Sequence, residues 1–399
     1  MRLYNTLSRR VEELHFPDGI VRMYVCGITP YDASHLGHAR VGIVYDTLRR
    51  YLEHRGCDVH YVQNVTDIDD PLFERAKRDG VPWDVLGNRE MERYLDALAR
   101  VNVEKPRFYI RATEVIDVMQ PIIQRLIGVG CAYVTDGSVY YDVKSFPSFG
   151  EIFHGDYAQM LETANERGNN PDAPGKRDPL DFVLWQPSGA DEPSWPSPWG
   201  PGRPGWHIEC STIATHYLGP QLDIHGGGAD LIFPHHAAEI AQAEPANNVA
   251  PFVRCWMHVG MVYMDGEKMS KSLGNMVFVE ELLERHSPDG IRLSVLGYRY
   301  RDEYGYNPDR VAEAEQAAVR LRTAVETEVG GTQDRVDGTR QRERFLAALE
   351  DDFDTPGAIA ALVDLADEIL ERAELGHDVK AAQTALRELG NVLGLTLRS

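Results

Sequence analysis

Two histidines, His35 and His38, lie three positions apart in the sequence His-Leu-Gly-His, soon after a short apolar run. Imidazoles at this spacing can both face a ligand at the turn between a strand and a helix, and Gly37 lets that ligand approach closely. The free N–H groups and the positive dipole end of the following helix would attract phosphate. The pattern predicts a phosphate-binding turn, although taken alone it also fits two ordinary loop histidines.

A second candidate phosphate-binding segment follows more than 200 residues later, in the sequence GEKMSKSLGN. Lys268 and Lys271 lie on a small-residue loop that can close over a triphosphate. There they would stabilise the charge that builds on the α-phosphorus during adenylate formation. Between the two segments lies a glycine run that would leave room for adenosine, with Asp230 placed to accept hydrogen bonds from ribose hydroxyls. The run consists of Gly226, Gly227, Gly228 and Ala229.

Soft and borderline metal ligands form a third constellation. Cys26 ends the first predicted strand, Cys210 lies in GRPGWHIEC, and His235 and Glu239 are four residues apart on a predicted helix. The spacing of four puts the last two side chains on one face of that helix. Two thiolates, an imidazole and a carboxylate fit a tetrahedral zinc site. A single buried cysteine would be an ordinary small apolar residue, so the prediction depends on the set.

Composition limits the class of protein. The chain has 399 residues, of which 43% are hydrophobic and 26% charged, as in a globular protein of two or three domains. Its five scattered cysteines argue against a disulfide framework. No apolar run is long enough to span a bilayer and the N-terminus lacks a leader pattern, so we expect a cytoplasmic protein without membrane contact. The net charge of −21 disfavours a large nucleic-acid interface.

The elements that would position these residues follow a βαβ pattern. Residues 23–27 form an apolar run typical of a buried strand, residues 41–54 have helical periodicity, and residues 58–64 alternate as a second strand. This order predicts a parallel sheet, in which ligands bind at the carboxyl ends of the strands. We expect the histidine turn to lie at that edge.

The remainder of the chain divides by composition. Residues 71–103 are mostly helical in pattern, whereas residues 147–203 are dense in Pro, Gly and Ser and are expected to be irregular. A strand over residues 222–225 and a helix starting near His235 restore the βα pattern. From residue 309 to the end the chain is helical in pattern, interrupted by a linker over residues 330–339.

The motifs in this order resemble the class I aminoacyl-tRNA synthetases, and the cysteine and histidine set is similar to that of the cysteinyl-tRNA synthetase family. The resemblance runs from Met23 to about Gly394. It implies an α/β fold with a Rossmann-like catalytic domain, an inserted segment and a C-terminal helical domain. The expected divisions are residues 1–110 and 204–262 for the two halves of the catalytic domain, 111–203 for the insertion, 263–310 for the KMSKS loop and connecting fold, and 311–399 for the helical bundle.

The resemblance also implies roles for residues. His35, His38, Lys268 and Lys271 would be catalytic, with ATP and Mg²⁺ as the co-substrate. Zinc on Cys26, Cys210, His235 and Glu239 would bind the thiol of substrate cysteine directly. ATP and the adenylate would contact Gly27, Ile28, Thr29, Gly226, Gly227, Gly228, Ala229, Asp230 and Val262, and the substrate cysteine would contact Thr29, Asn64, Val65, Thr66 and Trp206.

Two acceptors are open for the activated cysteine. The Glu166–Pro171 sequence, ERGNNP, and the end of the chain at LGLTLRS resemble the mycothiol-pathway ligases, which join cysteine to the amine of glucosaminyl-inositol. The retained Glu239 instead resembles the tRNA synthetases, and Val41 replaces a threonine usual in both. The sugar amine is the preferred interpretation, with a cysteine–tRNA ligase lacking the anticodon-binding region as the alternative. A non-catalytic paralogue and a nucleotidyltransferase are further alternatives, and we expect a monomer.

Overall fold

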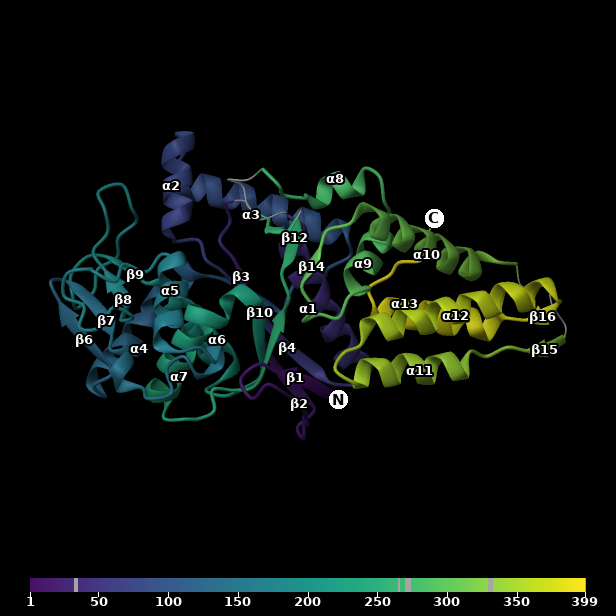
Figure 1. Ribbon diagram of the computed structural model, residues 1–399, viewed down its shortest axis with the longest axis horizontal. Coiled ribbons are helices and arrows are strands. Elements are labelled where there is room, and N and C mark those ends of the chain that lie inside the picture. The colour runs from purple at the N-terminus through teal and green to yellow at the C-terminus, as the bar shows by residue number, and fades with distance from the viewer. Residues whose placement is uncertain (32–34, 265, 270–273, 329–332, 399) are drawn as a thin grey trace.

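The computed structural model describes residues 1–31, 35–264, 266–269, 274–328 and 333–398, so Lys271 lies outside the described residues. Its centre is a five-stranded sheet with the order β11-β10-β3-β4-β5, in which every neighbouring pair is parallel. Strands β10, β3 and β4 are labelled in the middle of the molecule in Figure 1. The strands are β3 (Ile20–Ile28), β4 (Asp58–Val65), β5 (Phe108–Arg111), β10 (Leu222–Gly228) and β11 (Val253–Val259). The expected strand–helix–strand unit and parallel sheet are confirmed.

The order in which the chain adds strands to the sheet reverses between β3 and β10, although the two strands are parallel. From β3 the chain proceeds outward to β4 and β5, and it later returns to place β10 on the other side of β3. The register pairs Met23 with Ile224 and Val25 with Gly226, so the carboxyl ends of the two strands lie together. A crevice at such a reversal is where open α/β sheets bind ligands.

Helix α1 (Leu36–His54) begins directly after His35, which is its N-cap residue. Its inward face buries Val44, Leu48 and Leu52, the stripe that the helical periodicity of residues 41–54 predicts. Helices α2 (Asp70–Asp79) and α3 (Trp83–Arg100) follow β4. Further helices around the sheet are α4 (Ile116–Gly128), α6 (Trp206–Leu218) and α7 (Ala237–Asn247), with the short turns η1 (Ala112–Val115), η4 (Ala229–Leu231) and η5 (Ile232–His236).

The segment expected to be irregular, residues 147–203, is more regular than predicted. It contains helix α5 (Tyr157–Glu166) and strand β8 (Phe182–Gln186), which joins a second, antiparallel sheet with the order β6-β7-β8-β9. The run FVLWQ is buried on both sides of the strand, with Trp185 fully inaccessible. The other elements here are β6 (Ala132–Thr135), β7 (Ser138–Tyr141), β9 (Arg203–Pro204), η2 (Val143–Ser145) and η3 (Glu151–Phe153).

A small three-stranded sheet follows the central one and carries the start of the KMSKS segment. Strand β12 (Val262–Met264) pairs in parallel with β14 (Tyr304–Gly305) and antiparallel with β13 (Glu267–Lys268). Helices α8 (Val279–Leu283) and α9 (Pro288–Leu296) lie between β13 and β14 in the chain, and β1 (Arg2–Asn5) and β2 (Arg10–Glu13) form a separate hairpin.

Four long helices form the C-terminal region, at the opposite end of the molecule from the antiparallel sheet (Figure 1). They are α10 (Pro308–Glu326), α11 (Thr339–Glu350), α12 (Thr355–Glu374) and α13 (Lys380–Val392). Part of the expected linker lies outside the described residues, and part forms β15 (Gln333–Arg335), which pairs with β16 (His377–Asp378). Along the described stretches, every helix is too short or too polar to cross a bilayer.

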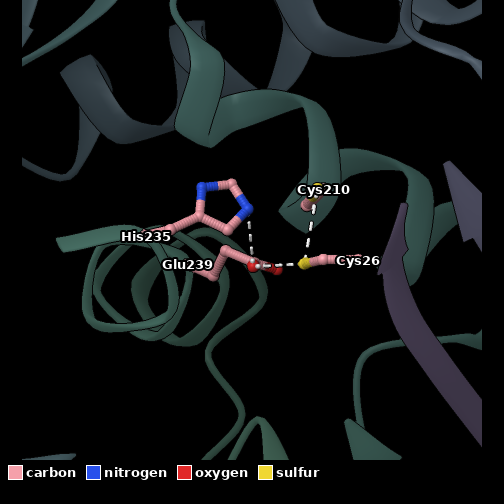
Figure 2. Close-up of side chains that lie close together, drawn as sticks. All are labelled: Cys26, Cys210, His235 and Glu239. Atoms are coloured by element: carbon pink, nitrogen blue, oxygen red, sulfur yellow. Dashed lines mark hydrogen bonds and ion pairs between the residues drawn. The ribbon is translucent and has the colours of Figure 1, made fainter. Parts of the chain in front are cut away.

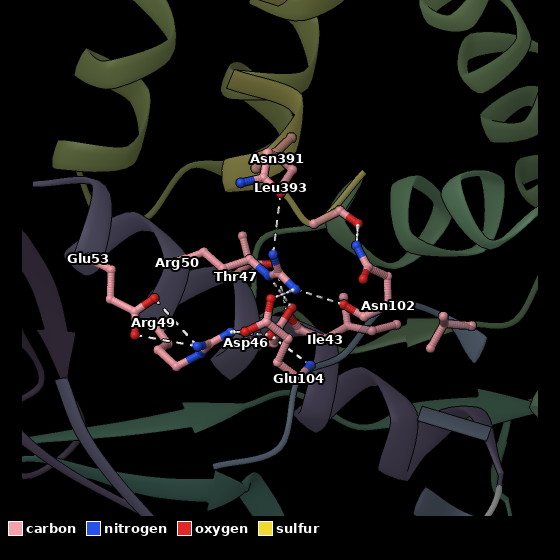
Figure 3. Close-up of polar contacts among 12 residues, drawn as sticks. Ile43, Asp46, Thr47, Arg49, Arg50, Glu53, Asn102, Glu104, Asn391 and Leu393 are labelled. Atoms are coloured by element: carbon pink, nitrogen blue, oxygen red, sulfur yellow. Dashed lines mark hydrogen bonds and ion pairs between the residues drawn. The ribbon is translucent and has the colours of Figure 1, made fainter. Parts of the chain in front are cut away.

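A buried charge network joins this helical region to the catalytic core (Figure 3). Arg292 of α9 is fully inaccessible, and its Nη2 lies 2.8 Å from Oδ2 of Asp46 in α1. The same guanidinium donates through Nε to the carbonyl of Leu393 at 2.8 Å and through Nη1 to that of Asn102 at 3.0 Å. One side chain thus fixes three segments that are far apart in the sequence.

Candidate active site

A cavity of about 1070 Å³ opens at the reversal of the central sheet, beside the carboxyl ends of β3 and β10. Its wall includes residues from β3, the histidine turn, the antiparallel sheet of the inserted segment and β12. The residues predicted from the sequence that line it are Cys26, Gly27, Ile28, Thr29, His35, His38, Trp206, Gly228, Asp230 and Val262. Motifs that are distant in the sequence therefore face one space.

Four of the predicted side chains converge beside this space, and one of them, Cys26, lies on its wall (Figure 2). The ligand atoms of Cys26, Cys210, His235 and Glu239 all lie within 4.8 Å of one another. The two sulfur atoms are 3.8 Å apart, and the Cys26 sulfur is 3.5 Å from Glu239 Oε1. His235 Nε2 is 3.2 Å from the same oxygen, as the spacing of four residues predicts.

The helix that carries this pair begins later than expected. His235 lies in the turn η5 (Ile232–His236), and α7 starts only at Ala237. Trp206 stacks on the His235 ring with centroids 4.4 Å apart and an interplanar angle of 19°, which fixes the ring against α6. The imidazole is therefore held in place by packing even though it precedes the regular helix.

Electrostatics make this cluster unfavourable unless a cation joins it. Burial raises the pKa of the Cys26 thiol and of the Glu239 carboxyl well above their ordinary values, and burial lowers the pKa of His235 well below its ordinary value. Each group is thus pushed to its neutral form. A divalent ion would reverse the trend for the thiols and the carboxyl, because it stabilises their deprotonated forms. Two sulfurs, one imidazole and one carboxylate are a donor set that suits a borderline metal.

Further histidines surround the cluster and were not singled out in the sequence. His225 Nε2 is 2.9 Å from Glu239 Oε2, and His236 Nε2 is 3.3 Å from the Cys26 sulfur. With Cys26 and Glu239 they form a second set whose ligand atoms lie within 4.8 Å of one another. The signal was present as two neighbouring histidines in FPHH and one in DIHGGG, but their common location depends on the pairing of β10 with β3.

The histidine turn lies at the start of α1, on the cavity wall. The rings of His35 and His38 have centroids 3.9 Å apart, so the two imidazoles are neighbours, as their spacing predicts. The backbone of the turn is tied to the chain beyond the KMSKS segment, because Leu36 N donates to Val277 O at 2.8 Å and His35 bridges to Phe278. The N-terminus of a 19-residue helix thus points into the cavity.

Several predicted substrate contacts are placed behind the wall rather than on it. Asn64 is buried, accepts a hydrogen bond from Gly27 N at 2.7 Å and donates to Thr66 Oγ1 at 3.0 Å. It therefore holds the end of β3 in position. Val65 and Thr66 are also buried. Among the described residues that line the cavity, none of these three is included.

The glycine run serves the sheet as well as the cavity. A Cβ on Gly226 would lie 1.8 Å from Met257 O and 2.0 Å from the hydroxyl of Tyr45, so the close approach of β11 and α1 requires glycine at this position. A Cβ on Gly227 would lie 2.8 Å from Leu231 Cδ1, the end of a flexible side chain, and 3.5 Å from Cys26 Cβ, which is an ordinary contact. In the described part of the cavity wall, Gly228 and Asp230 are present and Gly226, Gly227 and Ala229 are not.

The lysine loop is described only in part. The backbone of Lys268 pairs with Tyr263 in the small sheet, and Met269 lines the cavity. Lys271, predicted to be catalytic, lies outside the described residues. The loop thus starts at the cavity wall.

A parallel sheet with a cavity at its reversal and the histidine turn at its edge define a class I synthetase fold. Comparison with protein families agrees with this: residues 13–316 match the model described as tRNA synthetases class I (C) catalytic domain, and residues 344–398 match the DALR domain. The chain belongs to the cysteinyl-tRNA synthetase family of class I synthetases.

Relatives of two kinds match the chain almost equally. An L-cysteine:1D-myo-inositol 2-amino-2-deoxy-alpha-D-glucopyranoside ligase of Thermobispora bispora is 46% identical over 91% of this chain and 88% of its own length. A cysteine–tRNA ligase of Dehalococcoides mccartyi is 43% identical over 100% of this chain and 86% of its own length. Both are ligases, which confirms the predicted enzyme class.

Solved structures confirm the predicted fold class. Mycobacterium tuberculosis methionyl-tRNA synthetase in complex with methionyl-adenylate superposes with a TM-score of 0.66, covering 94% of this chain and 89% of its own, at 16% identity. At that identity the likeness concerns the fold, including the Rossmann-like sheet and the helical C-terminal domain.

Proposed function

We propose that this enzyme activates the carboxyl group of L-cysteine with ATP and transfers the cysteinyl group to the amine of glucosaminyl-inositol, a step of mycothiol biosynthesis. The observation that carries the proposal is the convergence of Cys26, Cys210, His235 and Glu239 beside a cavity that His35 and His38 also line. A thiol-selective site and a nucleotide site in one cavity are what cysteinyl adenylate formation requires. The names of the ligase relatives support the same reaction.

Zinc is the ion that we assign to the cluster. When bound, it would supply a ligand position that a substrate thiol can take and that a serine hydroxyl fills far less well, because soft ligands bind zinc more tightly. An apolar pocket alone cannot separate two such similar side chains by the large factor that fidelity needs. Trp206, stacked on His235, would close the pocket around the cysteine side chain.

In the first step, the cysteine carboxylate attacks the α-phosphorus of ATP and pyrophosphate leaves with Mg²⁺. His35 and His38 would contact the phosphates at the N-terminus of α1, where the helix dipole favours negative charge. Lys268 and Lys271 would stabilise the charge on the leaving pyrophosphate. Catalysis of this kind depends mainly on positioning and charge stabilisation. Asp230 and Val262, on the cavity wall, would contact the ribose and the base.

In the second step, the acceptor amine attacks the carbonyl carbon of the adenylate and AMP leaves. An ammonium group must first lose a proton, and Lys176 on the cavity wall can take it. Its Nζ contacts only neutral partners among the described residues, Asn169 Oδ1 at 2.6 Å and Pro179 O at 3.3 Å, and burial lowers the pKa of Lys176 to about 8. Asn169, Asn170 and Gln186 line the same side and suit a polyhydroxylated acceptor.

A cysteine–tRNA ligase is the second candidate. The observation that favours it is Glu239, which completes the four-residue set in the manner of the tRNA synthetases. The match to cysteine–tRNA ligases over the whole chain also agrees with it. Under this function the acceptor would be the terminal ribose hydroxyl of tRNA, and the first step would be unchanged.

The deciding experiment supplies purified protein with ATP, Mg²⁺ and radiolabelled cysteine, with glucosaminyl-inositol and total tRNA in separate tubes. The proposal predicts label on the sugar amine and none in acid-precipitable tRNA. Label on tRNA alone would replace it with the second candidate. Absence of both products and of cysteine-dependent ATP–pyrophosphate exchange would indicate a non-catalytic paralogue, and exchange that survives Cys210→Ser would favour a nucleotidyltransferase. Serine in place of cysteine is the control for selectivity.

A further inference from the structure

Arg40 lies two residues after the histidine turn and is fully inaccessible to solvent. A buried guanidinium is costly unless its donors are paired, and proteins usually pair it with a carboxylate. In the described part of the chain, both Nη groups of Arg40 donate to backbone carbonyl groups instead, whereas Nε is buried without a hydrogen-bond partner. The acceptors are Gly260 O (2.6 Å), Met261 O (3.4 Å), Arg299 O (3.1 Å), Tyr300 O (3.2 Å) and Asp302 O (2.7 Å).

These carbonyls belong to two segments that are themselves joined. Gly260 N donates to Tyr300 O at 2.8 Å, and a Cβ on Gly260 would lie 2.3 Å from Asp302 O, so only glycine allows this approach. The Tyr304 ring lies under the guanidinium, with the Arg40 carbon 4.5 Å from its centroid. Tyr304 in turn stacks on Tyr298 with centroids 3.8 Å apart. The guanidinium is thus the common centre of the two segments.

The first of these segments forms part of the nucleotide side of the cavity. Gly260, Met261 and Val262 all line it. Val262 begins β12, which pairs in parallel with β14 and antiparallel with β13, the strand that contains Lys268. The hydrogen bonds of Arg40 to these carbonyl groups, together with the pairing of β12 and β13, therefore connect the histidine turn to the segment that starts the lysine loop.

We propose that Arg40 is a positioning residue that fixes the wall formed by Gly260–Val262 against the first turns of α1, and so sets how tightly and how selectively the nucleotide base is held. The inference rests on the proposed use of ATP by this cavity. The guanidinium does not contact the nucleotide itself in this account. It acts by holding backbone, because five carbonyl groups in two segments converge on one planar set of donors.

The test is Arg40→Lys, assayed by cysteine-dependent ATP–pyrophosphate exchange. A lysine keeps the charge but offers one ammonium in place of the planar donor set, so it cannot reach both segments. The KM for ATP should rise at least about tenfold while the KM for cysteine changes by less than about twofold. The ratio of kcat/KM for ATP to that for GTP should fall, because a loosened wall distinguishes the bases less well. A purely structural role of Arg40 would lower kcat/KM for ATP and kcat/KM for GTP by the same factor.

Arg292→Lys is the matched control. Arg292 is equally buried and also donates to backbone carbonyls, but its region lies away from the cavity. This variant should lose thermal stability without a change in either KM or in the nucleotide ratio. If folded Arg40→Lys behaves in the same way, the proposal is overturned.

A second pair of variants decides the question if Arg40→Lys does not fold. Tyr304→Leu removes the ring beneath the guanidinium, and Tyr304→Phe keeps it. The leucine variant should raise the KM for ATP and lower the nucleotide ratio, and the phenylalanine variant should match the wild type. If Tyr304→Leu and Tyr304→Phe had the same KM for ATP and the same nucleotide ratio, the proposal would be contradicted. Wild-type protein without cysteine-dependent exchange would instead contradict the proposed function, so the two failures are distinguishable.

Discussion

Two buried polar regions of this molecule differ in how their charges are satisfied. Around Asp46, every carboxylate oxygen has partners within the chain (Figure 3). Oδ1 accepts from Arg49 at 3.0 Å and from Glu104 N at 3.1 Å, and Oδ2 accepts from Arg50 at 2.9 Å and Arg292 at 2.8 Å. Burial alone would raise the pKa of Asp46, but Arg292 and Arg50 hold it below its ordinary value.

The cluster at the end of β3 is equally buried, and the residues that the structure describes give it no such partners (Figure 2). Among the described residues, the possible charge partners of Glu239 are His225, His235 and His236. Burial lowers the pKa of each histidine, so none of them supplies a positive charge. Two thiols complete the set, and Cys26 lies on the cavity wall. Acceptor atoms therefore converge without a cation from the chain.

The contrast separates a structural network from a ligand site. A network that supplies its own countercharges can bind the domains together and needs nothing more. A buried group of acceptors that lacks a countercharge is unfavourable by itself, and a bound cation restores the balance. Breaking the first should therefore change stability, and breaking the second should change metal content and activity.

The largest effect is expected from Cys210→Ser. A hydroxyl is a poor ligand for a borderline metal, so bound metal should fall from about one ion per chain toward zero, and cysteine-dependent exchange should fall at least about 100-fold. Metal analysis and the exchange assay measure the two quantities. Cys255→Ser is the control, since Cys255 is a buried thiol of β11 outside the cluster. Full metal content in the Cys210 variant would remove Cys210 from the ligand set.

The second effect is on stability, from Asp46→Asn. Removing one partner of a buried pair leaves the Arg292 charge uncompensated, and such losses cost about 3 to 5 kcal/mol. Urea unfolding should show this loss, while metal content stays at the wild-type value. A loss of metal together with stability would mean that the two regions are coupled. An Asp18→Asn variant controls for removal of a charge, because the pair of Asp18 with Arg22 is exposed.

The sequence predicts these two regions unequally. The cluster was predictable because thiols and imidazoles are rare residue types and because His235 and Glu239 have helical spacing. The network was not predictable, since Asp46 and Arg292 are common residues separated by 246 positions in the chain. Their meeting depends on how α1 and α9 pack, which no local pattern encodes.

The fold also divides into features that a local sequence pattern predicts and features that depend on contacts between distant segments. The strand–helix–strand start was predictable from the apolar run and the helical stripe. Strand β8 was missed because Pro and Gly dominate the sequence around FVLWQ, although five apolar-rich residues between turn signals are typical of a buried strand. The packing requirement for glycine at position 226 could not be predicted for a similar reason, because the atoms that need its missing side chain come from β11 and α1.

A smaller effect on the cluster is expected from Glu239→Gln. The amide keeps an oxygen but loses the charge, so metal affinity should fall by about 10- to 100-fold and activity should recover when metal is added. A chelator competition series measures the affinity. Glu244→Gln is the matched control on the same helix, where the carboxylate accepts from Phe252 N and lies outside the cluster. Unchanged affinity would show that three residues suffice for the site.

The smallest effect is the pH dependence of the Asp46 network. Because the folded pKa of Asp46 lies below its unfolded value, its contribution to stability is fully present above the unfolded pKa of about 4 and is lost as pH falls through the folded pKa. The difference in unfolding free energy between wild type and Asp46→Asn should therefore be constant above about pH 5 and shrink toward acid. Other carboxyl groups titrate equally in both proteins, so the difference isolates this one. A gap that stays constant down to pH 3 would contradict the lowered pKa of Asp46, and a gap that closes already near pH 6 would contradict the pairing with Arg292.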